Sequence, residues 1–111
     1  MGYEIKIIVG VKYGNYINDI AQVDLCKSII RSTKLNDDAE ETGFYSDCGE
    51  MITKDVYGEK LYANDIYTVL ETIKAAHEEE YYRRYAIAIP MLESIIRDFQ
   101  GSELRCILYG H

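Results

Sequence analysis

The segment that most constrains the fold is 81–100, which reads as one long amphipathic helix. Its apolar residues recur at steps of three and four, so they share one stripe of the helix surface: Tyr85, Ile89, Leu92, Ile95, Ile96 and Phe99. Such a stripe has to be buried against a sheet or another helix, which the rest of the chain must supply. Pro90 lies inside this segment and has no backbone N–H, so the sequence predicts a kink or a break there.

A second helix is predicted over 65–79, directly before the first. Asn64 is the predicted N-cap, since its side chain can accept a hydrogen bond from a free amide of the first turn. The predicted buried stripe of this helix consists of Ile66, Val69, Leu70, Ile73 and His77. We expect a turn near Glu80 between the two helices. The alternative is one continuous helix of about 36 residues, which is long for a small domain.

Strands are predicted at both ends of the chain. Segment 3–13 alternates in side-chain character, which predicts a strand with one buried face. The side chains predicted to share that face are Ile5, Ile7, Val9, Val11 and Tyr13. Gly14-Asn15 predicts a tight turn into a second strand at 18–28, so the first two strands should form a hairpin. Segment 103–109 is apolar on both faces, and we expect it inside the sheet beside the first strand.

The middle of the chain is polar and rich in turn-forming residues. Segment 31–42 is predicted to be a loop, and 43–46 and 50–56 are predicted to be short strands around the turn Asp47-Cys48-Gly49. The resulting order, β-β-β-β-α-α-β, predicts an α+β fold with two helices packed on one face of a mainly antiparallel sheet. The length of 111 residues predicts one domain, 1–111.

Composition limits the chemistry that this chain can perform. Its three cysteines are too few and odd in number for a disulfide framework, so we expect reduced thiols. Cys26 and Cys106 are predicted to be small sheet residues, Cys48 an exposed turn residue, and His77 a boundary residue of its helix. From these patterns we expect no catalytic residues, no metal site and no cofactor. No apolar run approaches the roughly 18 residues of a membrane span, so we expect no membrane association.

The eleven tyrosines are the most unusual feature of the composition, because Tyr is common at half-buried positions and interfaces. Two adjacent tyrosines at the helix junction cannot both face the core, since neighbours on a helix lie about 100° apart. The predicted partner-binding residues are Tyr81, Tyr82, Arg83 and Arg84. A competing explanation for the arginines is pairing within one helix, from Glu79 to Arg83 and from Glu80 to Arg84. The net charge of −7 makes nucleic-acid binding unlikely.

Three short motifs resemble those of small acidic proteins of unassigned function encoded by phages. They are Asp24-Leu25-Cys26-Lys27, Asp55-x-Tyr57-Gly58 and Leu108-Tyr109-Gly110-His111. The resemblance implies a non-enzymatic protein that is expressed in the host cytoplasm and binds a host protein.

We therefore expect a non-enzymatic protein-binding module, specifically a phage-type inhibitor of a host protein with a possible anti-defence role. A homodimer through the long helix is the rival to a host partner. The alternative functions are a small-molecule-binding or sequestering protein and an acidic DNA mimic. A ligand-binding protein would show a concave, largely apolar pocket, whereas a contact protein would show a flat, exposed, tyrosine-rich patch.

Overall fold

The structure is a computed structural model that describes residues 4–27 and 32–111. Within these ranges the strands are β1 (Glu4–Tyr13), β2 (Tyr16–Lys27), β3 (Phe44–Tyr45), β4 (Met51–Ile52), β5 (Asn64–Asp65) and β6 (Leu104–Gly110). The helices are α1 (Ile66–Glu79) and α2 (Arg83–Asp98). The predicted end residues Tyr3, Ser28 and Arg31 lie outside the described residues.

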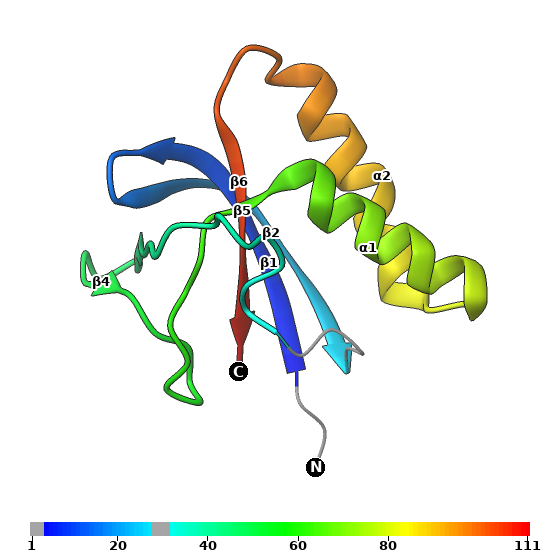
Figure 1. Cartoon of the computed structure of the whole chain (residues 1–111), viewed down its shortest axis with the longest axis horizontal. Helices are drawn as coiled ribbons and strands as arrows, with labels where there is room; N and C mark the ends of the chain where they lie inside the picture. The colour runs from blue at the N-terminus through cyan, green and yellow to red at the C-terminus, as the bar shows by residue number, and fades with distance from the viewer. Residues whose placement is uncertain (1–3, 28–31) are drawn as a thin grey trace.

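The strands form one mixed sheet in the order β4-β3-β2-β1-β6-β5 (Figure 1). Each pairing is antiparallel except that of β2 with β3, which are parallel and paired at Ile17 and Phe44. The predicted α+β class and the place of β6 beside β1 are confirmed. The short strand β5, just before α1, is an addition to the predicted order.

The β1–β2 hairpin has the longest strand pairing of the sheet. Tyr13 pairs with Tyr16, and Gly14 takes a φ of 57°, so the predicted two-residue turn is confirmed. The strand register shifts between Glu4 and Lys6 and again between Val9 and Gly10. Gly10 is needed at the second shift, because a Cβ atom there would overlap the carbonyl oxygen of Asn18 on β2.

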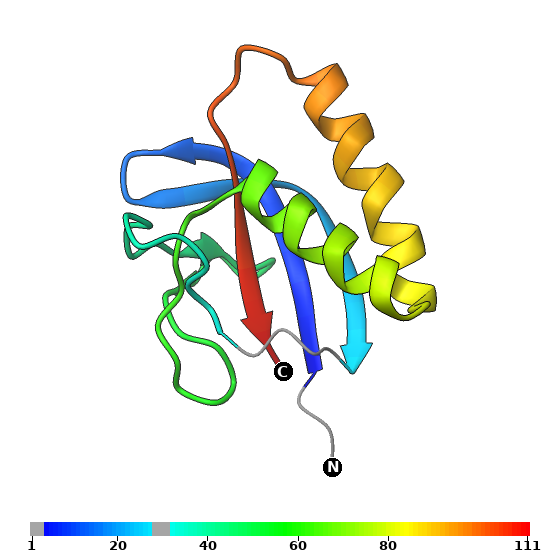
Figure 2. The same ribbon diagram turned by 45° about the vertical axis from the view of Figure 1, so that its right-hand side comes forward.

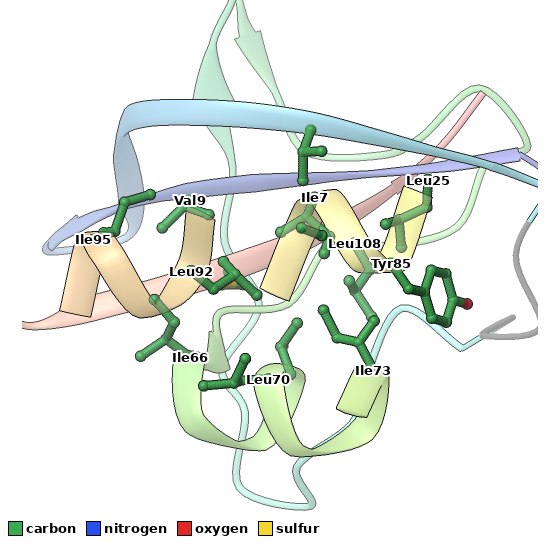
Figure 3. Close-up of a cluster of buried hydrophobic side chains, with 14 of the residues drawn as sticks. Ile7, Val9, Leu25, Ile66, Leu70, Ile73, Tyr85, Leu92, Ile95 and Leu108 are labelled. Carbon is green, nitrogen blue, oxygen red and sulfur yellow. The ribbon is translucent and has the colours of Figure 1, made fainter. Parts of the chain in front are cut away.

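Both helices cover the same face of the sheet (Figures 1 and 2), as predicted. Figure 3 shows side chains of α1 and α2 converging on those of the central strands. The buried residues of this core include Ile7, Val9, Leu25, Ile66, Leu70, Ile73, Tyr85, Leu92, Ile95 and Leu108. Burying one such side chain contributes roughly 1.5–3 kcal/mol, so this layer is the main source of stability. His77 on α1 is half-buried, as predicted for a boundary residue of its helix.

A second, smaller core lies on the opposite face of the sheet. Its buried residues are Ile8, Ile17, Phe44, Leu61, Ala63 and Ile107, with Ile52 and Tyr109 packed against them. The prediction that β1 has only one buried face was therefore wrong. The polar middle of the chain folds across this face and contributes Phe44, Leu61 and Ala63, which the alternation within β1 alone does not reveal.

The start of α1 differs from the prediction by one residue. Asp65, not Asn64, is the N-cap, and its carboxylate accepts hydrogen bonds from the amides of Tyr67 and Thr68 at 3.1 and 3.2 Å. Asn64 is instead fully buried in β5. Its side-chain oxygen accepts from the Leu35 amide at 2.7 Å. Asn64 therefore joins the 32–36 segment to the sheet rather than capping the helix.

The two helices are separate, as expected, because Glu80 has an extended backbone with φ of −152° and ψ of 138°. α2 begins at Arg83 and continues through Pro90 to Asp98, so of the two predicted outcomes at Pro90, a kink or a break, the break does not occur. Phe99, predicted to lie on the buried stripe, is 38% exposed, because the helix has ended and Phe99 is its C-cap residue.

Candidate functional site

The predicted partner-binding residues lie together where α1 meets α2, and we call Tyr81, Tyr82, Arg83 and Arg84 the helix-junction surface. Tyr81 is 72% exposed, and its ring lies 5.0 Å from that of His77. Tyr82 is half-buried, and its ring lies 5.0 Å from that of Tyr85. The two adjacent tyrosines therefore do differ in exposure.

Tyr82 has a structural role at this junction. Its amide donates a hydrogen bond to Nδ1 of His77 at 3.3 Å, and its hydroxyl contacts Oε2 of Glu80 at 3.2 Å. Partial burial, followed by the hydrogen bond to Glu80, raises the pKa of the Tyr82 phenol. Tyr81 is consequently the tyrosine that is available to a partner.

The arginines are exposed, and the predicted pairs with Glu79 and Glu80 do not form. Those pairs needed one continuous helix, and the extended backbone at Glu80 interrupts it. Among the described residues, neither Arg83 nor Arg84 has a carboxylate within ion-pair distance. Ile87, one turn further along α2, is also exposed. Ile87 lies outside the apolar stripe of this helix, so its exposure is consistent with the sequence pattern.

A second surface lies at the tip of the β1–β2 hairpin. Tyr13, Tyr16, Tyr45 and Met51 follow one another across β1, β2, β3 and β4, and we call them the tyrosine row. The rings of Tyr13 and Tyr16 are stacked with centroids 6.1 Å apart, and Tyr16 meets Tyr45 edge-on at 5.2 Å. Met51 is paired with Tyr45 in the β3–β4 ladder. Four strands thus bring side chains from distant parts of the sequence into one contiguous band.

The tyrosine row is largely open to solvent, with Tyr13 53% and Tyr45 49% exposed. The hairpin tip extends away from both helices, which leaves it uncovered by them (Figures 1 and 2). Tyr13 was predicted to share the buried face of β1, and that prediction was wrong because the strand is longer than the helical cover. The contact between Tyr16 and Tyr45 depends on the parallel β2–β3 pairing, which no local pattern of residues predicts.

Two hollows lie near the start of α1 in the described part of the chain. One, of about 360 Å³, is lined by Lys12, Asn36, Asp38, Ala39, Glu40, Ala63, Asp65 and Arg105. Within it, Lys12 and Glu40 form an ion pair at 3.1 Å. A second, of about 270 Å³, lies between the start of α1 and the end of α2. The first hollow is lined mainly by charged and polar groups, whereas the second combines charged groups with apolar side chains from the two helix ends.

The three cysteines are free and differ in exposure. Cys106 is buried, and burial together with the charge of Asp65 raises the pKa of its thiol. Cys48 is exposed in the β3–β4 turn, as predicted, and Cys26 is half-buried. In the ranges that the structure describes, no three His, Cys, Asp or Glu side chains are arranged to hold a metal ion.

Comparison with protein-family models, with curated proteins and with solved structures finds no match for this chain. Of α1 and α2, the helices of the described residues, neither has the length and apolar character needed to cross a membrane.

Proposed function

We propose that this protein acts by protein–protein contact and that the tyrosine row is its principal contact surface. The observation that carries the proposal is the exposed band of three tyrosines and Met51 across four strands. Tyrosine combines a large apolar ring with a polar tip and few rotatable bonds, so it loses little entropy on binding. Methionine adapts its shape to the opposing surface.

The size of the row indicates its role within an interface. A stable interface buries about 800 Å² on each partner, which four side chains do not supply alone. They match the central cluster that carries most of the binding energy, surrounded by a polar rim. The acidic charge of −7 favours a partner with a basic surface, because opposite charges speed association.

Among possible partners we propose a host protein that is inhibited by the contact, in keeping with the resemblance to small acidic phage-encoded proteins. The helix-junction surface is the second candidate, because it offers exposed Tyr81 beside two arginines without a described ion pair. A DNA mimic would use ordered carboxylates instead of aromatic rings, which the tyrosine row does not provide.

The test compares affinity baits that carry one altered surface each. The wild-type chain, a Tyr13→Ser/Tyr45→Ser variant and a Tyr81→Ser/Arg83→Ser variant are immobilised and exposed to bacterial host lysate, and captured proteins are identified by mass spectrometry. We expect a specific protein on the wild-type bait that is retained by the Tyr81/Arg83 variant and lost from the Tyr13/Tyr45 variant. With the purified partner, the Tyr13/Tyr45 variant should bind at least tenfold more weakly, or about 1.4 kcal/mol.

All substituted side chains are at the surface, so the variants should keep the wild-type melting curve. Equal capture by the wild type and the Tyr13/Tyr45 variant would reject the tyrosine row. Loss only from the Tyr81/Arg83 variant would assign the contact to the helix junction. Light scattering at two protein concentrations separates a host partner from self-association, since a dimer would show a mass that rises with concentration.

A further inference from the structure

The hollow between the helix ends combines apolar walls with a few polar groups. We call it the helix-end hollow; it is lined by Asp65, Ile66, Tyr67, Ile96, Phe99, Gln100, Gly101, Ser102, Leu104 and Arg105. Its volume is about 270 Å³, close to the lower end of small-molecule sites. The turn after α2 forms one wall: the Ser102 amide donates to the Phe99 carbonyl at 3.1 Å, and Gly101 takes a φ of 86°.

Arg105 is the principal cationic group of this hollow. Its Nη1 donates to the Leu104 carbonyl at 2.8 Å, which anchors the side chain beside its own strand. Among the described residues, no carboxylate lies within ion-pair distance of its guanidinium. A guanidinium has five N–H donors in a planar fork that matches a carboxylate or a phosphate. Donors of Arg105 therefore remain for a ligand.

The acidic groups around Arg105 are mostly engaged by other partners. Asp65 faces the same hollow, but its carboxylate caps α1 through the amides of Tyr67 and Thr68. Arg105 also lines the neighbouring 360 Å³ hollow, where Lys12 pairs with Glu40. Among the residues that the structure describes, no cation lies within ion-pair distance of Asp38 in that hollow, so its charge opposes an anion.

The apolar half of the helix-end hollow is formed by residues of both helices. Phe99 is 38% exposed, Tyr67 is exposed and Ile96 is half-buried. These side chains surround a concave site instead of lying singly on a convex surface, so covering them would remove apolar area from water. The ligand that complements the site has an apolar part beside an anionic group.

We propose that the helix-end hollow binds a small amphiphilic anion, whose carboxylate or phosphate pairs with Arg105 and whose apolar part packs on Phe99 and Tyr67. The site is separate from the tyrosine row, so its occupation is a further function of the chain. Carboxylates and phosphates share the geometry that the guanidinium recognises, and the choice between them is left to measurement.

The test is a titration of ¹⁵N-labelled protein followed by NMR, with three probes that share a phenyl group. The probes are 3-phenylpropanoate, 2-phenylethyl phosphate and the neutral 3-phenylpropanamide. We expect at least one anion to bind tenfold or more tightly than the amide, with shift changes at the amides of residues 99–105. Preference for the carboxylate or for the phosphate identifies the head group.

The Arg105→Gln variant should remove the preference for the anion, and Arg105→Lys should restore part of it. Arg97→Gln is the matched control, because Arg97 lies on α2 outside the hollow and pairs with Asp98 at 3.2 Å. Phe99→Ala should weaken the binding of the phenyl-bearing anion but leave the weak binding of acetate unchanged. Asp38→Asn should tighten anion binding, since it removes a repulsive charge.

The proposal is overturned if none of the probes binds, if the amide binds as well as both anions, or if Arg105→Gln keeps the wild-type preference. A folded Arg105→Lys variant keeps the test decisive should Arg105→Gln unfold. None of these results bears on the tyrosine row, because its test uses different residues and a different partner.

Discussion

Asn64 is a single buried amide on which the attachment of the 32–36 segment depends, so its replacement tests the structure sharply. Its side-chain oxygen accepts from the Leu35 amide at 2.7 Å, and its nitrogen donates to the Thr33 carbonyl at 2.9 Å. Longer bonds of 3.3 Å reach the carbonyls of Tyr62 and Cys106. Asn64→Leu keeps a similar volume but removes all four bonds.

The expected loss follows from these distances. Each of the two short bonds contributes about 1 kcal/mol net, and the two longer bonds together add about 1 kcal/mol, so Asn64→Leu should cost roughly 3 kcal/mol. A protein of this size has a free energy of unfolding of about 5–15 kcal/mol, of which this is a large fraction. The corresponding decrease in Tm is about 10–15 °C.

Urea unfolding followed by far-UV circular dichroism measures this loss, with an unchanged m-value as the sign that the native and denatured states are otherwise alike. Asn18→Ala, at an exposed position on β2, is the control and should stay within about 0.5 kcal/mol of wild type. Hydrogen exchange of the Leu35 amide should accelerate more than that of the β1–β6 ladder. An Asn64→Leu variant within about 1 kcal/mol of wild type would refute the reasoning.

One truncation in each core should destabilise the protein by a similar amount. Leu92→Ala under the helices and Ile8→Ala on the opposite face should each lower the free energy of unfolding by roughly 2–5 kcal/mol in urea titrations. A loss under about half a kcal/mol would mean that the side chain is not buried. Pro90→Ala should raise the free energy of unfolding by up to about 3 kcal/mol, because it restores an amide inside α2; a lower midpoint would contradict this. Iodoacetamide should alkylate exposed Cys48 at neutral pH but reach Cys106 only in urea, since burial raises the pKa of that thiol. Mass spectrometry of the alkylated peptides locates the label, and labelling of Cys106 in the folded protein would contradict its burial.

The helix stripes were predictable because a buried helix face repeats every three to four residues. Leu92 and Ile95 are buried on α2 and Val69 and Ile73 on α1, as that period requires. The paired strands at the two ends of the chain were predictable for a similar reason, since alternation and a Gly-Asn turn are local signals. The choice between Asn64 and Asp65 as N-cap was not, because both side chains can cap a helix and only the packing around Asn64 decides.

The candidate sites were harder to predict than the fold. The prediction of Tyr81, Tyr82, Arg83 and Arg84 as partner-binding residues depended on the frequency of Tyr and Arg in interfaces and on helical spacing of the two tyrosines. The structure places both tyrosines before α2 begins, so their different exposure has another cause. The tyrosine row depends on Tyr45 lying beside Tyr16, and the helix-end hollow depends on Arg105 meeting Phe99 and Tyr67. These encounters arise from pairing between distant segments, and neither period nor composition contains them.

The position of β6 between β1 and β5 has a consequence for how the chain acquires its structure during synthesis. The β1–β2 hairpin can close within microseconds of its emergence, because its turn is two residues long. The partner on the other side of β1 is separated from it by about 90 residues, so closing that loop costs far more entropy. At about 5–20 residues per second, a ribosome needs roughly 5–20 seconds to make the intervening chain. During this interval the edge of β1 and both of its apolar faces lack their final partners, which makes the nascent hairpin the stage most exposed to aggregation.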